Sequence, residues 1–281
     1  MKIATVTITR LGNKYLREYV KYYKALGVDK MYFYDNNHED EPKVNEVLQD
    51  YIDCGFVEAI PFGNVEGRIQ EIAYQDFYDK HGKEYDWICV FDDDEYVTLN
   101  FCGNLKTFLT NKKFDSANGV CFPMVNFCDT GIIVNFKNTR LDVYTEVKSL
   151  DKIWNRSFYK TIVRGMLNAN YIAGYYENNF NQFYTDGCHI PVIDGICFNS
   201  IVDCDGNVIE LSNAGSATRF MTTNGFLKHI PTGCIDDYMN MKMKRDWPDT
   251  NNKQNFGYEY FTYYNNHTDE KYNYYLTHLN K

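Results

Sequence analysis

Long apolar runs are missing from this 281-residue sequence. None approaches the roughly 18–20 consecutive apolar residues that a membrane-spanning helix needs, so we expect no transmembrane segment. The first ten residues alternate like a strand and lack the long apolar core of a signal peptide. We therefore expect a cytoplasmic protein that makes at most peripheral contact with the inner membrane, for which residues 239–245 supply methionines and cations.

Clustered cysteines and an excess of positive charge are also missing. The nine cysteines are scattered, and none forms a C-x-x-C pair. This pattern predicts reduced thiols rather than a disulfide framework or a zinc site. The formal net charge of −9 weighs against nucleic acid as a partner.

Two common phosphate-binding loops are absent as well. No G-x-G-x-x-G follows the first expected strand, and no G-x-x-x-x-G-K-[ST] occurs. Their absence disfavours a dinucleotide-binding fold and a P-loop. Any phosphates that this protein binds must be held in another way.

A regular alternation of strand and helix patterns is what the sequence does contain. Strands are expected at 3–9, 28–34, 56–60 and 86–91, and helices at 15–26, 43–52 and 67–81. Asn13 is expected to cap the first helix. Strands that alternate with helices predict an α/β fold with a mostly parallel, Rossmann-like sheet and helices on both faces.

The second half of the chain shows weaker periodicity. A short helix is expected at 105–109, strands at 119–127 and 157–164, a hairpin at 202–209 and a helix at 235–245. Residues 128–155 are loop-rich and suit a lid or an acceptor wall. We expect one domain over 1–245, with a nucleotide-binding half (1–100), a loop-rich acceptor half (101–245) and a Tyr-rich tail (246–281).

Four acids, Asp92, Asp93, Asp94 and Glu95, follow directly after the expected strand at 86–91. Ligands of open α/β sheets bind beyond the carboxyl ends of the strands. Hard divalent ions prefer carboxylate oxygens and often bridge them to phosphates. The acids therefore predict a metal–diphosphate site, with a solvated acidic turn or a helix N-terminus as the alternative.

Four segments resemble the GT-A glycosyltransferases of the family 92 and family 2-like type. Residues 15–36 are similar to the family's "E-[WY]-[VI]-x-[YH]-[YH]…[YF]-[IF]-Y-D-N" block, and 86–96 to its "D-W-…-D-x-D-E-[FY]" segment. The other two are 160–164, with 189–191 after it, and 229–238, which is similar to "H-Y-x-T-K-S-x-E-E-[FY]".

The resemblance implies a GT-A-like fold and a hexosyltransferase. The donor would be a nucleotide-sugar, a UDP-sugar such as UDP-galactose, and the cofactor Mn²⁺ or Mg²⁺. The sugar would pass with inversion to a saccharide or lipid-linked saccharide hydroxyl in surface polysaccharide or glycan synthesis.

The resemblance also implies roles for single residues. The metal ligands would be Asp92, Asp94 and His229. The nucleotide would lie against Thr9, Arg10, Asp35, Arg68, Gln70, Asp92 and Asp93. Asp35 has an equal alternative as a turn residue that binds its own backbone. Lys160 and Arg164 would offset diphosphate charge, with ordinary surface charges as the alternative.

An inverting transfer needs a general base for the acceptor hydroxyl. Asp186 is expected to be that base, since it follows the acid cluster at about the spacing common in related inverting enzymes, with a plain turn aspartate as the alternative. His189 is a second catalytic candidate, and Asp194 and the pair Asp236/Asp237 are the remaining ones.

Two other functions fit parts of the pattern. A nucleotidyltransferase acting on sugar phosphates would normally show a Gly-rich basic loop after the first strand, and residues 11–14 resemble one only faintly. A non-catalytic, calcium-dependent sugar-binding module would need neither the parallel sheet nor His229, since histidine is a poor calcium ligand.

Overall fold

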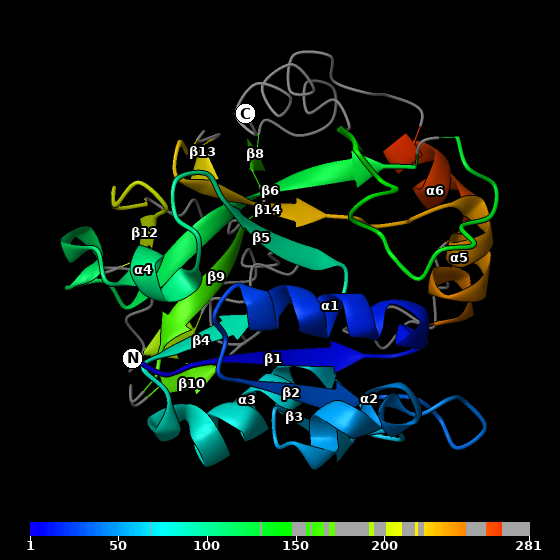
Figure 1. Cartoon of the computed structure of the whole chain (residues 1–281), viewed down its shortest axis with the longest axis horizontal. Coiled ribbons are helices and arrows are strands. Elements are labelled where there is room, and N and C mark those ends of the chain that lie inside the picture. The colour runs from blue at the N-terminus through cyan, green and yellow to red at the C-terminus, as the bar shows by residue number, and fades with distance from the viewer. Residues whose placement is uncertain are drawn as a thin grey trace.

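A large, mostly parallel β-sheet forms the centre of the molecule (Figure 1). The computed structural model describes residues 1–67, 69–129, 131–147, 156–157, 159–165, 169–171, 191–193, 201–209, 217–218, 222–245 and 257–265. The order of strands along the sheet is β3 (Val57–Pro61), β2 (Lys30–Asp35), β1 (Ile3–Thr9), β4 (Trp87–Val90), β9 (Tyr159–Arg164), β6 (Gly119–Cys128), β14 (Gly225–His229) and β5 (Glu95–Leu99). Within the described residues, no helix is both long and apolar enough to cross a bilayer.

The first ninety residues form the alternating pattern that the sequence predicts. The elements are β1 (Ile3–Thr9), α1 (Asn13–Ala25), β2 (Lys30–Asp35), α2 (Val44–Asp53), β3 (Val57–Pro61), α3 (Ile69–His81) and β4 (Trp87–Val90). β1 pairs in parallel with β2 and β4, and β2 with β3. The expected α/β class and parallel arrangement are therefore confirmed.

The second half completes the sheet with strands of both directions. Its main elements are β5 (Glu95–Leu99), α4 (Leu105–Leu109), β6 (Gly119–Cys128), β7 (Glu146–Val147), β9 (Tyr159–Arg164), β12 (Ile201–Asp203), β14 (Gly225–His229), α5 (Ile235–Asn240), the 3₁₀ helix η3 (Lys242–Lys244) and α6 (Tyr258–Asn265). β9 lies antiparallel between β4 and β6, β14 runs parallel to β6, and β5 runs antiparallel to β14.

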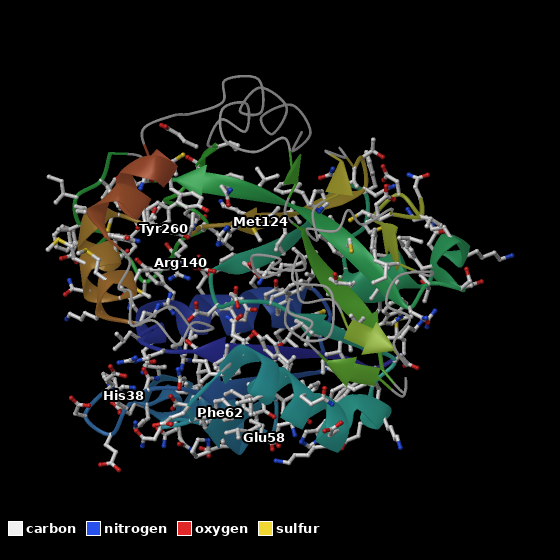
Figure 2. The ribbon with its side chains drawn as sticks, turned by 180° about the vertical axis from the view of Figure 1, so that it is seen from behind. His38, Glu58, Phe62, Met124, Arg140 and Tyr260 are labelled. Atoms are coloured by element: carbon white, nitrogen blue, oxygen red, sulfur yellow. The ribbon has the colours of Figure 1, made fainter. Side chains whose placement is uncertain are left out.

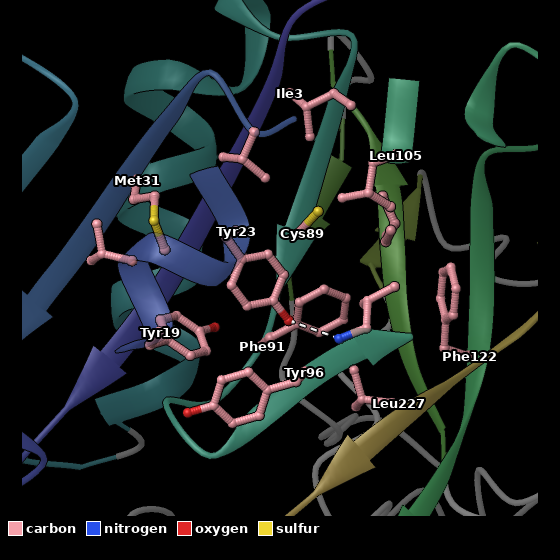
Figure 3. Close-up of a cluster of buried hydrophobic side chains, with 14 of the residues drawn as sticks. Ile3, Tyr19, Tyr23, Met31, Cys89, Phe91, Tyr96, Leu105, Phe122 and Leu227 are labelled. Atoms are coloured by element: carbon pink, nitrogen blue, oxygen red, sulfur yellow. Dashed lines mark hydrogen bonds between the residues drawn. The ribbon is translucent and has the colours of Figure 1, made fainter. Parts of the chain in front are cut away.

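Helices cover both faces of the sheet because successive strand residues point to opposite sides. Met31 and Phe33 of β2 lie in one buried cluster with Tyr19 of α1, whereas Tyr32 lies in a second cluster with Phe77 of α3. Figure 3 shows Tyr19 and Tyr23 of α1 beside Phe91 and Tyr96, the residues that flank the acid motif. Each such side chain stabilises the fold by about 1.5–3 kcal/mol on burial.

The carboxyl ends of β1, β2, β4, β6 and β14 meet at one edge of the sheet because these strands share a direction. The first residues of the antiparallel β9 lie at the same edge. Figure 1 shows β1, β6 and β14 ending toward the side where α5 and α6 lie. This carboxyl edge collects the side chains considered below.

Two expectations about the elements need correction, and the structure also shows a helix in the tail. Asn13 does not cap α1: Gly12 is the N-cap residue, and the Asn13 amide donates to the carbonyl oxygens of Pro42 and Lys43. The acids lead directly into a strand, β5, that the weak periodicity after residue 97 did not predict. The Tyr-rich tail contains α6, which packs against Tyr238 of α5.

Candidate active site

Three acids of the motif lie in the turn between β4 and β5, and the fourth, Glu95, begins β5; all four are mostly withdrawn from water. Asp93, Asp94 and Glu95 are no more than 3% exposed, and only the Asp92 side chain, at 30%, reaches the surface. Tyr23 of α1 donates its hydroxyl to the carbonyl oxygen of Glu95, 2.8 Å away, and so fixes the turn to the helix. A solvated acidic turn is therefore the wrong interpretation, because buried carboxylates need partners.

Lys160 contacts the first and last acids of the motif. Its Nζ lies 2.8 Å from Asp92 Oδ2 and 3.2 Å from Glu95 Oε1. Burial favours the neutral amine, but these carboxylates raise the pKa of Lys160 above its ordinary value. Burial raises the pKa of Glu95 to about 8, with Lys160 opposing the shift. Glu95 Oε2 also accepts the N–H of Asp92, which closes the turn.

Asp94 lies between a lysine and a histidine that come from the C-terminal part of the sheet edge. Lys242 Nζ is 2.7 Å from Asp94 Oδ2, and His229 Nε2 is 3.7 Å from Asp94 Oδ1. His229 Nδ1 donates to Asn126 Oδ1, 2.6 Å away, which leaves the lone pair on Nε2. Burial lowers the pKa of His229 to about 4, so the ring is neutral near pH 7.

This arrangement fits a divalent metal ion. Asp94, Glu95 and His229 each offer one ligand atom, and the three atoms lie within 4.8 Å of one another. Nε2 and Oδ1 lie 3.7 Å apart, beyond hydrogen-bond distance, so each keeps a lone pair that it can offer to a metal ion. A neutral imidazole with carboxylate oxygens suits Mn²⁺ and related ions. Among the described residues, Glu95 thus joins the predicted ligands Asp94 and His229, while Asp92 turns to Lys160.

The loop after β1 packs closely on the acid motif. Thr9 Oγ1 donates to Asp93 Oδ2 at 2.5 Å, so Thr9 is a partner of the motif. A Cβ at Gly12 would lie 2.1 Å from the same oxygen, which explains the glycine. Arg140 is buried and donates from Nη1 to the carbonyl oxygen of Asp93, 2.8 Å away. Figure 2 shows Arg140 on the side of the molecule where α5 and α6 lie.

Two residues that were predicted to contact the nucleotide, Arg10 and Asp35, have protein partners of their own. Arg10 pairs with Glu41 at 2.8 Å. Asp35 accepts the N–H groups of Asn37 and Val44, at 3.1 and 2.8 Å, through different oxygens. These contacts favour the alternative interpretation of Asp35 as a residue that organises the turn before α2.

The remaining predicted residues divide by position. Gln70 of α3 reaches Asp92 Oδ1, at 3.5 Å, and so lies at the site. Arg164 does not, because β9 carries it to the opposite edge of the sheet. There it stacks on Trp87 at 4.1 Å and donates to backbone oxygens, including that of Ala117. Arg68, Asp186, His189 and Asp194 lie outside the described residues.

Asp237 joins two helices rather than facing an open site. It accepts from Lys14 Nζ at 2.6 Å, from the hydroxyl of Tyr144 at 3.0 Å and from the hydroxyl of Tyr15. Burial opposes its charge, but Lys14 and Tyr15 hold the pKa of Asp237 below its usual range. Asp236 bonds to Asn240 within its own helix.

Sequence reasoning placed Glu95 in the acid motif but not among the metal ligands, and it missed the roles of Asn126, Arg140 and Lys242. Only Glu95 had a visible signal, because it is part of the D-x-D-E segment itself. Arg140 and Lys242 contact the motif across 47 and 148 positions, and Asn126 contacts His229 across 103, which no local pattern records.

Comparison with solved structures finds distant likenesses. The crystal structure of S. aureus TarS 1-349 is 13% identical, with a TM-score of 0.36, over 58% of this chain and 47% of that one. The same fragment in complex with UDP-GlcNAc is 13% identical, with a TM-score of 0.33, over 48% of this chain and 37% of that one. The 4-diphosphocytidyl-2C-methyl-D-erythritol synthase from Anaerococcus prevotii DSM 20548 is 10% identical, with a TM-score of 0.29, over 58% of this chain and 70% of that one. The match thus spans about half of the TarS fragment, and no curated protein matches.

A family model gives the stronger result. The model of glycosyltransferase family 92 matches residues 7–181, which is more than half of the chain. The match includes the end of β1, all of β2 to β4, the acid motif and Lys160. It makes the protein an enzyme and favours neither a nucleotidyltransferase nor a non-catalytic sugar-binding module. The chain, an α/β protein, belongs to glycosyltransferase family 92.

Proposed function

We propose that this glycosyltransferase moves a sugar from a UDP-sugar to a saccharide hydroxyl and depends on Mn²⁺ or Mg²⁺. The observation that carries the proposal is the buried group of Asp94, Glu95 and His229 at the carboxyl edge, with a neutral imidazole nitrogen facing a carboxylate. The UDP-sugar, the inversion and a role in surface polysaccharide or glycan synthesis follow from the family resemblance.

The residues around this group would contact different parts of the donor. Asp94 and His229 would hold the metal ion, with Glu95 beside them. When bound, the ion neutralises diphosphate charge and makes the nucleoside diphosphate a better leaving group. Asp92, the most exposed acid of the motif, would face the ribose together with Gln70 and Tyr74 of α3, which approach its Oδ1. Thr9 orients Asp93 and thereby fixes the loop between β1 and α1.

The transfer step exchanges one bond at the anomeric carbon for another. The bond to the diphosphate oxygen breaks and its electron pair leaves with the diphosphate. The acceptor oxygen bonds to the same carbon from the opposite face and gives up its proton. We keep Asp186 as the proton acceptor, with His189 as the second candidate. An Asp186→Asn variant should lose about 100-fold or more in turnover, with donor affinity nearly unchanged.

The acceptor half would lie along residues 101–245, and its exposed apolar side chains support contact with a membrane that carries a lipid-linked acceptor. Phe136 is 91% exposed, Ile133 71% and Met239 54%. The N–H of Asp236 donates to the carbonyl oxygen of Ile133, which holds the loop against α5. Met241 and Lys242, by contrast, turn inward. Phe136→Ser should therefore reduce co-sedimentation with phospholipid vesicles, and wild-type protein that never sediments with vesicles would remove membrane contact from the proposal.

The metal-dependent donor site is tested by titrating UDP into the protein with Mn²⁺ and with EDTA. We expect EDTA to weaken UDP binding at least tenfold, and Asp94→Asn to abolish the difference. Asp50→Asn on α2 is the matched control, because that carboxylate is 58% exposed and pairs with Arg17 on the surface. Equal UDP affinity and turnover with and without EDTA would overturn metal dependence.

A further inference from the structure

Asp94 pairs with Lys242, a cation that lies in the 3₁₀ helix η3 and not in the sheet. The Lys242 side chain is 13% exposed, and its Nζ lies 2.7 Å from Asp94 Oδ2. The other lysine of the site, Lys160, is only 2% exposed and lies between Asp92 and Glu95. Because Lys160 stands in β9, it neutralises the motif from within the sheet. Lys242 is the more accessible of the two ammonium groups.

The segment that carries Lys242 crosses the carboxyl edge. It follows β14 and α5, and η3 places Lys242 against the turn after β4. Three residues later, Arg245 Nη1 donates to the carbonyl oxygen of Arg10, which directly follows β1. Met243 packs near Tyr238 and Phe261, so helices α5 and α6 hold the segment in place. Ligands of such sheets bind beyond the carboxyl ends of the strands, the region that Lys242 borders.

We propose that Lys242 contacts the diphosphate of the donor and stabilises it as the leaving group. This inference rests on the proposed function, because it needs a diphosphate beside Asp94. An ammonium group carries three N–H donors and can bridge a carboxylate and a phosphate oxygen. A donor diphosphate beside Asp94 would therefore lie within reach of the same ammonium that holds Asp94 Oδ2.

Lys242 acts by charge and not by proton transfer. As the anomeric carbon–oxygen bond breaks, negative charge grows on the departing diphosphate. A fixed cation beside that charge stabilises the transition state more than the ground state. The acceptor proton goes to the general base, and the Lys242 ammonium keeps its protons throughout.

The test measures UDP affinity, Mn²⁺ affinity and turnover separately. Lys242→Met keeps the length of the side chain and removes the charge. With saturating Mn²⁺, UDP affinity and turnover should each fall about 10- to 100-fold, as expected for losing a charged hydrogen bond. Mn²⁺ affinity without nucleotide should stay equal or rise, because a competing cation is gone. Lys242→Arg should restore part of the UDP affinity.

Lys244→Met is the matched control, since Lys244 lies in the same 3₁₀ helix with its side chain exposed. It should leave all three quantities unchanged. If Lys242→Met does not fold, Lys242→Gln replaces it and keeps a hydrogen-bond donor without the charge. Unchanged UDP affinity and turnover in the folded variant, or loss of Mn²⁺ binding itself, would overturn the role of Lys242 alone. Wild-type protein that binds none of UDP, GDP and CDP in Mn²⁺ would overturn the proposed function.

Discussion

Single residues of the acid motif serve different partners although they are consecutive. Asp93 accepts from Thr9 and Asp94 pairs with Lys242, while Glu95 accepts the N–H of Asp92. A turn of four acids would otherwise be unstable, because buried like charges repel one another. The sequence shows the acids, but their partners come from distant strands and helices. The motif was therefore predictable as a site, whereas the partner of each acid was not.

Protons should compete with the metal ion for the carboxylate of Glu95 and not for the ring nitrogen of His229. Burial raises the pKa of Glu95 to about 8, so it binds a proton below that pH, and metal must displace the proton. Burial lowers the pKa of His229 to about 4, so this ring stays neutral at higher pH. We expect Mg²⁺ affinity to rise from pH 6 to pH 8.5, measured by calorimetry. Glu95→Gln should flatten the dependence of Mg²⁺ affinity on pH. If the variant still shows a transition with a midpoint near pH 6.5, the competing proton belongs to a histidine with an ordinary pKa.

Gly12 should tolerate no side chain. An added Cβ would lie 2.1 Å from Asp93 Oδ2 and 2.6 Å from Thr9 Oγ1, and these two atoms are joined by a hydrogen bond. Gly12→Ala should therefore cost about 1–3 kcal/mol in the free energy of unfolding, measured with urea, and weaken UDP binding. Gly103→Ala is the control, because nothing lies within 4 Å of the added Cβ. Equal stability of both variants would contradict the close packing of this loop on the motif.

Elements that are distant in sequence are joined at the site by buried polar contacts. Asp237 of α5 connects to Lys14 and Tyr15 of α1, and Asn135 of the intervening loop donates to the Tyr15 hydroxyl at 3.0 Å. α1 also fixes the acid motif through Tyr23. One helix thus links the β4–β5 turn to the segment that carries Lys242.

Asp237 should matter for stability more than for proton transfer. Asp237→Ala leaves the hydroxyls of Tyr15 and Tyr144 without their shared acceptor, at a cost of about 2–3 kcal/mol. Asp236→Ala, one position earlier, should change the free energy of unfolding by less than about 0.5 kcal/mol. A Asp237→Asn protein with wild-type stability but 100-fold lower turnover would contradict this assignment and make Asp237 a general-base candidate again.

At the scale of the whole molecule, the first half was more predictable than the second. β1 to β4 alternate with helices in sequence order, so local periodicity predicts both the elements and their parallel pairing. β9 inserts between β4 and β6 and reverses direction, which no local pattern reveals. That reversal explains why Lys160 reaches the site while Arg164, on the same strand, lies at the opposite edge.

The domain should extend past the expected boundary at residue 245. Phe261 of α6 packs on Tyr238, and Asn265 both accepts the N–H of Asp129 at 2.8 Å and donates to Thr232 Oγ1 at 3.0 Å. Truncation after Arg245 removes these contacts and exposes Tyr238, for an expected loss of about 3 kcal/mol. In a protein of this size, that corresponds to a fall in Tm of about 6–12 °C, measured by circular dichroism.

Two full-length variants separate the contribution of α6 from a general effect of shortening the chain. Phe261→Ala should reproduce part of the fall in Tm through lost packing, and Asn265→Ala part through the unpaired N–H of Asp129. UDP affinity should fall further on truncation than in either variant, because α5 and α6 together hold the segment of Lys242. If the truncated protein has the Tm and the UDP affinity of the full chain, the domain ends at residue 245 as the sequence predicts.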